Sequence, residues 1–93
     1  MANKAHAATV RRLSERYGLS NGRPFDLMGE NLIIEVETAA TVAEGIRKLL
    51  LAGGRRYVAM TNQESVEDAL LVARTTEIGV MSPRGDIVKD CGR

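Results

Sequence analysis

Three acidic residues, Asp26, Glu35 and Glu37, are spaced so that their carboxylates could meet on one side of a β-hairpin. Glu35 and Glu37 are two residues apart within residues 31–38, a segment rich in Ile and Val that is typical of a strand. Because side chains alternate between the two faces of a strand, both glutamates point to the same face. Gly29-Glu30 predicts a turn before this strand, and Asp26 lies in the short strand that precedes the turn.

The register of this hairpin decides whether Asp26 joins the two glutamates. With a two-residue turn, Asp26 pairs with Ile33 and therefore faces the same way as Glu35 and Glu37. A four-residue loop keeps this parity, whereas a three-residue loop breaks it. Three carboxylates this close repel one another, and a divalent cation with oxygen ligands, Mg²⁺ or Mn²⁺, would relieve the repulsion.

The alternative interpretation is a solvated sheet face. Alternating glutamates on a hairpin strand most often lie on the wet side of a half-exposed sheet. Two features favour the metal site: the strand lies between two helix-forming segments, as a central strand would, and Asp26 has the matching parity.

The rest of the chain predicts the elements that position this strand. Apolar spacing, a capping box at Thr41 and glycines at helix ends indicate where helices begin and end. The order α-β-β-α-β-α-β-β predicts a single α/β domain, residues 1–93, as a sandwich around a central mixed sheet, with 89–93 as a flexible tail. The predicted elements are a helix at 3–17, strands at 25–28 and 31–38, a helix at 41–52, a strand at 56–61, a helix beginning at 65, and strands at 78–81 and 87–88.

Composition narrows the classes of function. The 93 residues suffice for one small domain, and 44% hydrophobic with 27% charged residues is typical of a folded chain. A net charge of +1 excludes a histone-like polycation, so nucleic-acid contacts would need local clustering of charge. A core this small is marginal, so we expect a homodimer.

The sequence also bears on compartment. Its longest apolar stretch, residues 49–52, is too short to span a membrane, and the basic N-terminal segment has no apolar run typical of a secretory signal. The single cysteine, Cys91, cannot form an internal disulfide, which fits a reducing cytoplasm. We therefore expect a cytoplasmic protein with no membrane partner and no organic cofactor.

The motif residues resemble a known nuclease superfamily. Pro24-Phe25-Asp26, followed by residues 32–38, a helix and the strand sequence RYVAM, is similar to the PD-(D/E)XK superfamily, which includes restriction endonucleases and archaeal Holliday-junction resolvases. The resemblance extends from His6 to Val88 and implies a restriction-endonuclease-like fold. Phe25 separates the proline from the aspartate, and Glu37 stands where the family usually has lysine, although some restriction enzymes of the superfamily carry Glu-x-Glu there.

The resemblance implies a metal-dependent mechanism. Asp26, Glu35 and the backbone carbonyl of Val36 would hold Mg²⁺ or Mn²⁺, which polarises the scissile phosphate and activates a water molecule. Glu37 would act as general base or as a further ligand. The resemblance also turns a polar residue of the first helix, here His6, toward the site, although a surface histidine is the alternative.

Basic residues complete the expected site. Lys48 or Arg47 could supply the positive charge of the missing lysine, or both could be solvated helix positions. Four arginines predict a patch that contacts phosphates beside the acidic site. These are Arg11, Arg12, Arg16 and Arg23.

The sequence thus predicts a divalent-metal-dependent phosphodiesterase acting on DNA. The absence of a separate recognition domain favours structure-selective or non-specific cutting by a dimer. A catalytically degenerate relative that serves as a DNA-binding or assembly module is the alternative, and a small interaction protein unrelated to nucleic acid is a third.

Overall fold

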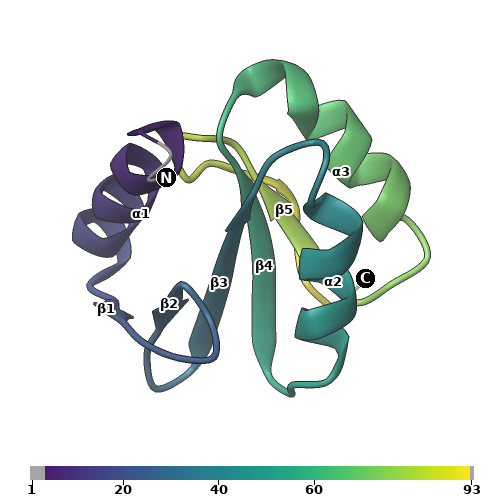
Figure 1. Ribbon diagram of the computed structural model, residues 1–93. Coiled ribbons are helices and arrows are strands. Elements are labelled where there is room, and N and C mark those ends of the chain that lie inside the picture. The colour runs from purple at the N-terminus through teal and green to yellow at the C-terminus, as the bar shows by residue number, and fades with distance from the viewer. Residues whose placement is uncertain (1–3, 93) are drawn as a thin grey trace.

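A six-stranded mixed sheet forms the centre of the protein (Figure 1). The computed structural model describes residues 4–92. The strands lie in the sheet in the order in which they occur in the chain; β3, β4 and β5 are parallel, and the remaining neighbours are antiparallel. The strands are β1 (Ser20–Asn21), β2 (Leu27–Met28), β3 (Leu32–Glu37), β4 (Arg55–Met60), β5 (Gly79–Met81) and β6 (Ile87–Lys89).

Three helices cover the two faces of this sheet. Helix α1 (Lys4–Tyr17) packs on one face, and α2 (Val42–Leu50) and α3 (Val66–Ala73) lie side by side on the other (Figure 1). A single 3₁₀ turn, Gln63–Ser65, leads into α3. The helices α2 and α3 form the crossovers that parallel strands require. Within residues 4–92, no helix is long and apolar enough to cross a bilayer.

Each face of the sheet has its own apolar core. On the α1 side, Leu13 packs with Ile34 and Val36 of β3. On the α2 and α3 side, Ile46 packs with Val58, and Ile33 of β3 lies against the same cluster. Because side chains alternate along β3, the even-numbered residues face α1, and Glu35 and Glu37 face α2.

The predicted order of elements is confirmed, with one addition. Residues 20–21 form the short edge strand β1, where Asn-Gly and Pro predicted only a loop. Residue 3, where we expected the first helix to begin, lies outside the described residues. The segment 89–92, which we expected to form part of a flexible tail, is hydrogen-bonded to the domain: Lys89 Nζ donates to the carbonyl of Ile78 at 2.7 Å, and Gly92 N–H donates to the carbonyl of Glu77 at 2.8 Å.

The register of the hairpin differs from the prediction by two residues. Leu27 pairs with Ile34, whereas a turn at Gly29-Glu30 would have paired it with Leu32. The chain reverses one residue later, at Glu30-Asn31, and Gly29 N–H donates to the Leu32 carbonyl at 2.9 Å. Moving the centre of a turn by one residue shifts the pairing by two, so every side chain keeps its face.

Candidate metal centre

The structure brings the carboxylates of Asp26, Glu35 and Glu37 together. One oxygen of each lies within 4.8 Å of the others. Glu35 is buried, and Asp26 and Glu37 are half-buried. Hard carboxylate oxygens at this mutual spacing are the donor set that Mg²⁺ and Mn²⁺ prefer, so these residues fit such an ion.

The hairpin register creates this cluster. If the observed pairing of β2 with β3 is extended to the residue before Leu27, Asp26 lies opposite Glu35. Asp26 N–H donates to Glu35 Oε1 at 3.0 Å, and Val36 N–H donates to Asp26 Oδ2 at 2.8 Å. Since β2 begins only at Leu27, the Asp26 side chain accepts the Val36 N–H hydrogen bond that a strand partner would otherwise accept. These two hydrogen bonds hold the carboxylates of Asp26 and Glu35 in place without a bound ligand.

Lysine 48 provides the positive charge at the cluster. Its Nζ donates to Glu35 Oε2 at 3.1 Å and lies 5.4 Å from the centre of the Phe25 ring. The ion pair offsets the unfavourable burial of Glu35. Arg47, the other candidate for this role, is exposed on α2.

Glu37 has an unusual environment. The pKa of Glu37 is raised to about 7, chiefly by burial; the charges of Glu35 and Asp26 contribute to the rise, and a hydrogen bond with Thr41 opposes it. A Cβ atom on Gly45 would lie 2.5 Å from Glu37 Oε2. Glycine at this position of α2 therefore leaves the space that the Glu37 side chain fills.

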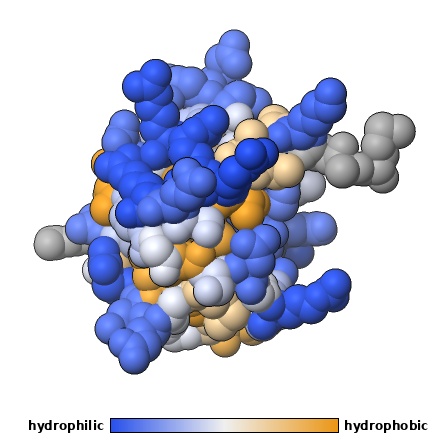
Figure 2. All heavy atoms as spheres, turned by 90° about the vertical axis from the view of Figure 1, so that its left-hand side faces the viewer, coloured by the Kyte–Doolittle hydropathy of each residue, from blue (hydrophilic) through white to orange (hydrophobic). Residues whose placement is uncertain are grey.

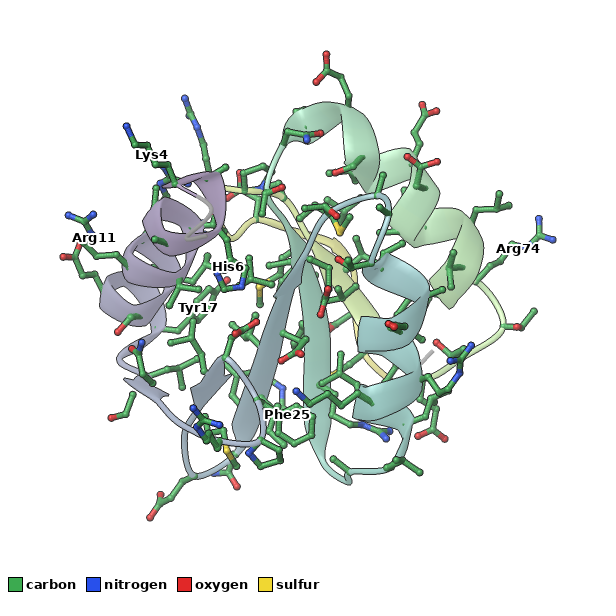
Figure 3. The ribbon with its side chains drawn as sticks, viewed as in Figure 1. Lys4, His6, Arg11, Tyr17, Phe25 and Arg74 are labelled. Carbon is green, nitrogen blue, oxygen red and sulfur yellow. The ribbon has the colours of Figure 1, made fainter. Side chains whose placement is uncertain are left out.

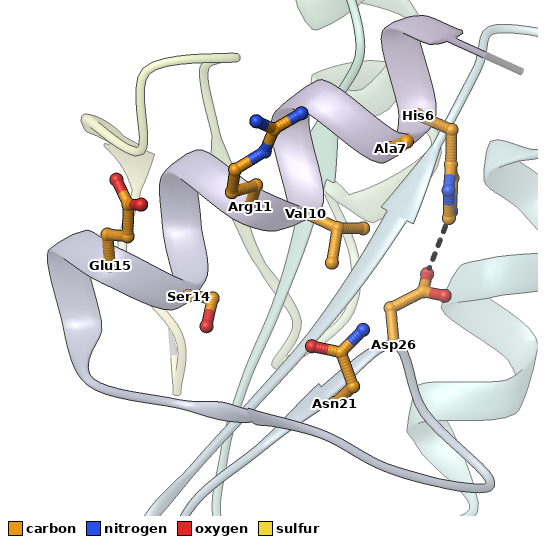
Figure 4. A pocket seen from close by; sticks show the side chains of 8 residues that line it. All are labelled: His6, Ala7, Val10, Arg11, Ser14, Glu15, Asn21 and Asp26. Carbon is orange, nitrogen blue, oxygen red and sulfur yellow. Dashed lines mark hydrogen bonds and ion pairs between the residues drawn. The ribbon is translucent and has the colours of Figure 1, made fainter.

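His6 connects the cluster to α1. Its Nε2 lies 3.3 Å from Asp26 Oδ2, and the two side chains point toward each other (Figure 4). They belong to the wall of a hollow of about 500 Å³ between α1 and the segment around β1. Arg11 and Asn21 also line this hollow, and Asp26 is the residue of the carboxylate cluster that reaches its wall (Figure 4).

The predicted arginine patch is divided in the structure. Arg11 stands at the rim of the hollow, with its side chain directed away from the sheet (Figure 3), and Arg23 is exposed in the loop before Asp26. Arg12 donates to the carbonyl of Pro83 at 2.8 Å, and Arg16 pairs with Asp86 at 2.8 Å. The turn at 82–86 therefore engages two of the four arginines. Hydrophilic side chains cover much of the side of the molecule that carries α1 (Figure 2).

Sequence reasoning missed the contribution of Gly45. A glycine inside a helical pattern predicts a close approach of another group, and that signal was available in residues 41–52. What approaches it, the side chain of Glu37, could be identified only once α2 was placed on the sheet.

Searches for similar family models, curated proteins and solved structures gave no match. The geometry of the carboxylate cluster therefore carries the functional assignment.

Proposed function

We propose that the protein is a divalent-metal-dependent phosphodiesterase that cleaves DNA at the cluster of Asp26, Glu35 and Glu37. The observation that carries this proposal is the convergence of the three carboxylates within 4.8 Å, with Asp26 and Glu35 held by backbone hydrogen bonds and Asp26 lining a hollow. The fold is an α/β domain with a mixed sheet; its assignment to the PD-(D/E)XK class is part of the proposal.

Asp26 and Glu35 would hold the ion, together with the Val36 carbonyl. In an extended strand the N–H and C=O of one residue point to the same edge, and the Val36 N–H points to Asp26. The Val36 carbonyl therefore belongs to the same edge as the Asp26 carboxylate. A bound Mg²⁺ or Mn²⁺ would polarise a phosphate oxygen and acidify a water ligand.

Glu37 and Lys48 would together perform the role of the lysine that the PD-(D/E)XK superfamily usually has at the position of Glu37. With a pKa of about 7, Glu37 can accept the proton of an attacking water near neutral pH. The Lys48 ammonium, held by Glu35, places a positive charge beside the developing phosphate charge.

The hollow beside Asp26 suits a nucleic-acid strand. Its lining includes the guanidinium-bearing Arg11 and the amide of Asn21. Protein contacts to phosphate and sugar use these side-chain types.

A cleavage assay tests this function. Branched, duplex and single-stranded DNA labelled at one end are incubated with Mg²⁺ or Mn²⁺, and we expect Glu35→Gln to reduce the rate by about a hundredfold or more. Glu30→Gln, which alters an exposed glutamate in the same hairpin, is the matched control and should cleave at the wild-type rate. Cleavage unaffected by Glu35→Gln, or calorimetry showing that neither ion binds, would refute the proposal.

The second candidate is a catalytically degenerate DNA-binding module. The Lys48–Glu35 ion pair favours it, because Lys48 neutralises the buried carboxylate without any metal. Here Lys48→Met separates the two functions. A nuclease should bind Mn²⁺ more tightly after this change, because a nearby positive charge is removed, and should cleave more slowly. A binding module should show no turnover before or after it.

A further inference from the structure

The outer face of α3 carries an apolar strip between two opposite charges. Glu67, Leu70, Leu71 and Arg74 line a shallow hollow of about 310 Å³ on this face. The residues are three, four and seven positions apart, so they share one side of the helix. Leu71 is 65% exposed, and Arg74 continues the helical backbone conformation and points into solvent (Figure 3).

The order of these residues is self-complementary. The midpoint between Glu67 and Arg74 is also the midpoint between Leu70 and Leu71. If a second α3 lies antiparallel across a two-fold axis at this midpoint, each Glu67 meets the Arg74 of the other copy. Each Leu70 then meets the other copy's Leu71. A two-fold interface requires this kind of match, since one patch must fit itself.

We propose that this strip, residues 67, 70, 71 and 74 of α3, is the contact surface of a homodimer whose partner is a second copy of the chain. Charge complementarity identifies the partner: antiparallel packing satisfies both ends of the strip, whereas parallel packing would place like charges together. Packing would also remove the exposed Leu71 from water.

Further apolar side chains are exposed at the end of the neighbouring helix α2. Leu50 and Leu51 at the end of α2 are 47% and 88% exposed, and α2 contacts α3 on the same face of the sheet (Figure 1). The α3 contact would thus be the centre of a larger two-fold interface, with charged residues at its rim.

Charge reversal tests the pairing. Analytical ultracentrifugation of the wild-type chain should show a concentration-dependent dimer. Glu67→Arg places two pairs of arginines face to face, and Arg74→Glu places two pairs of glutamates face to face, so each should weaken the dimer by about tenfold or more. An equimolar mixture of the two variants should form a heterodimer, because both contacts then join opposite charges.

Asp68→Arg is the matched control. It makes the same charge change in the same first turn of α3, but its side chain lies about 100° around the helix from Glu67, so the dimer should be retained. Circular dichroism checks that all variants are folded. A wild-type chain that is monomeric throughout, a mixture that fails to associate, or an Asp68→Arg variant as weak as Glu67→Arg would overturn the proposal.

Discussion

Glu37 fills a tight space against helix α2 in the carboxylate cluster. It lies between Glu35 on its own strand and the backbone of α2 at Gly45, and burial is the largest cause of its raised pKa. A carboxyl group that keeps its proton up to about pH 7 in the folded protein links the site to the stability of the whole chain.

The pH dependence of folding should reveal this linkage. The ordinary pKa of Glu37 is 4.5 and its folded value is about 7, so between these pH values the folded state keeps a proton that the unfolded state has released. This contribution to stability is therefore present below pH 4.5 and is lost as the pH rises to about 7. Urea unfolding of the metal-free protein at pH 5, 6, 7 and 8 should show the decline, and Glu37→Gln should remove it. An equal slope in both proteins would contradict the raised pKa.

Substitution of Gly45 should disturb the site more than the fold. Gly45→Ala places a methyl group 2.5 Å from Glu37 Oε2, so the carboxylate must move. Helix propensity improves by about 1 kcal/mol, which offsets the strain. We expect Mn²⁺ affinity to fall by about tenfold, as measured by calorimetry. Gly53→Ala, which enters open space, should leave affinity unchanged. If Glu37→Ala is made first, the Gly45 substitution should have no further effect on affinity.

At the scale of elements, the end of α2 depends on Arg56 of β4. This buried guanidinium donates to the carbonyls of Ala52 at 2.7 Å and Gly54 at 3.0 Å, and it pairs with Glu77 at 2.8 Å. Arg56 also donates to the carbonyl of Leu49 in the last turn of α2 at 3.3 Å, so it joins the end of α2 and the turn that follows it to β4. It thereby fixes how α2 meets the sheet, and with it the positions of Lys48 and Gly45.

Replacing Arg56 should destabilise the protein strongly. Arg56→Met removes the four hydrogen bonds that this buried guanidinium makes to the carbonyls of Leu49, Ala52 and Gly54 and to Glu77, and we expect a loss of about 2–4 kcal/mol in the free energy of unfolding. Arg56→Lys should be intermediate, because an ammonium cannot reproduce the planar fork. Arg47→Met, an exposed arginine on α2, should change stability by less than about 0.5 kcal/mol. Urea unfolding measures all three, and equal losses for Arg56→Met and Arg47→Met would contradict this role.

The elements and the acidic cluster could be predicted because they follow from local patterns. Alternation in residues 31–38 and the parity of Asp26 bring the carboxylates together even though the turn lies one residue later than expected. Long-range partners could not be predicted. Whether Lys48 or Arg47 reaches Glu35 depends on the rotation of α2 against the sheet. The destination of Arg16 depends on a turn about 70 residues further along the chain. The two-residue strand β1 is too short to leave an alternating pattern.

At the scale of the whole molecule, a net charge of +1 makes DNA binding depend on a few residues near the site. With Arg12 and Arg16 engaged by the 82–86 turn, the proposed function leaves Arg11 and Arg23 to contact phosphates near the site. Each phosphate contact contributes about −0.9 to the slope of log affinity against log salt.

We therefore expect weakly salt-dependent DNA binding, with a slope of about −2. Fluorescence anisotropy across a salt series measures it. Arg11→Gln and Arg23→Gln should each reduce the slope by about one contact, whereas Arg16→Gln should leave it unchanged, because Asp86 already holds that guanidinium. A slope that Arg11→Gln and Arg23→Gln leave intact would place the DNA elsewhere on the molecule.

The sheet ends on both sides in very short strands: β1 has two residues and β6 has three. The unpaired backbone N–H and C=O groups of an edge strand can pair with further chains and so start a fibril, and edge strands this short present few such groups. Concentrated solutions of this protein should accordingly contain discrete particles rather than fibres.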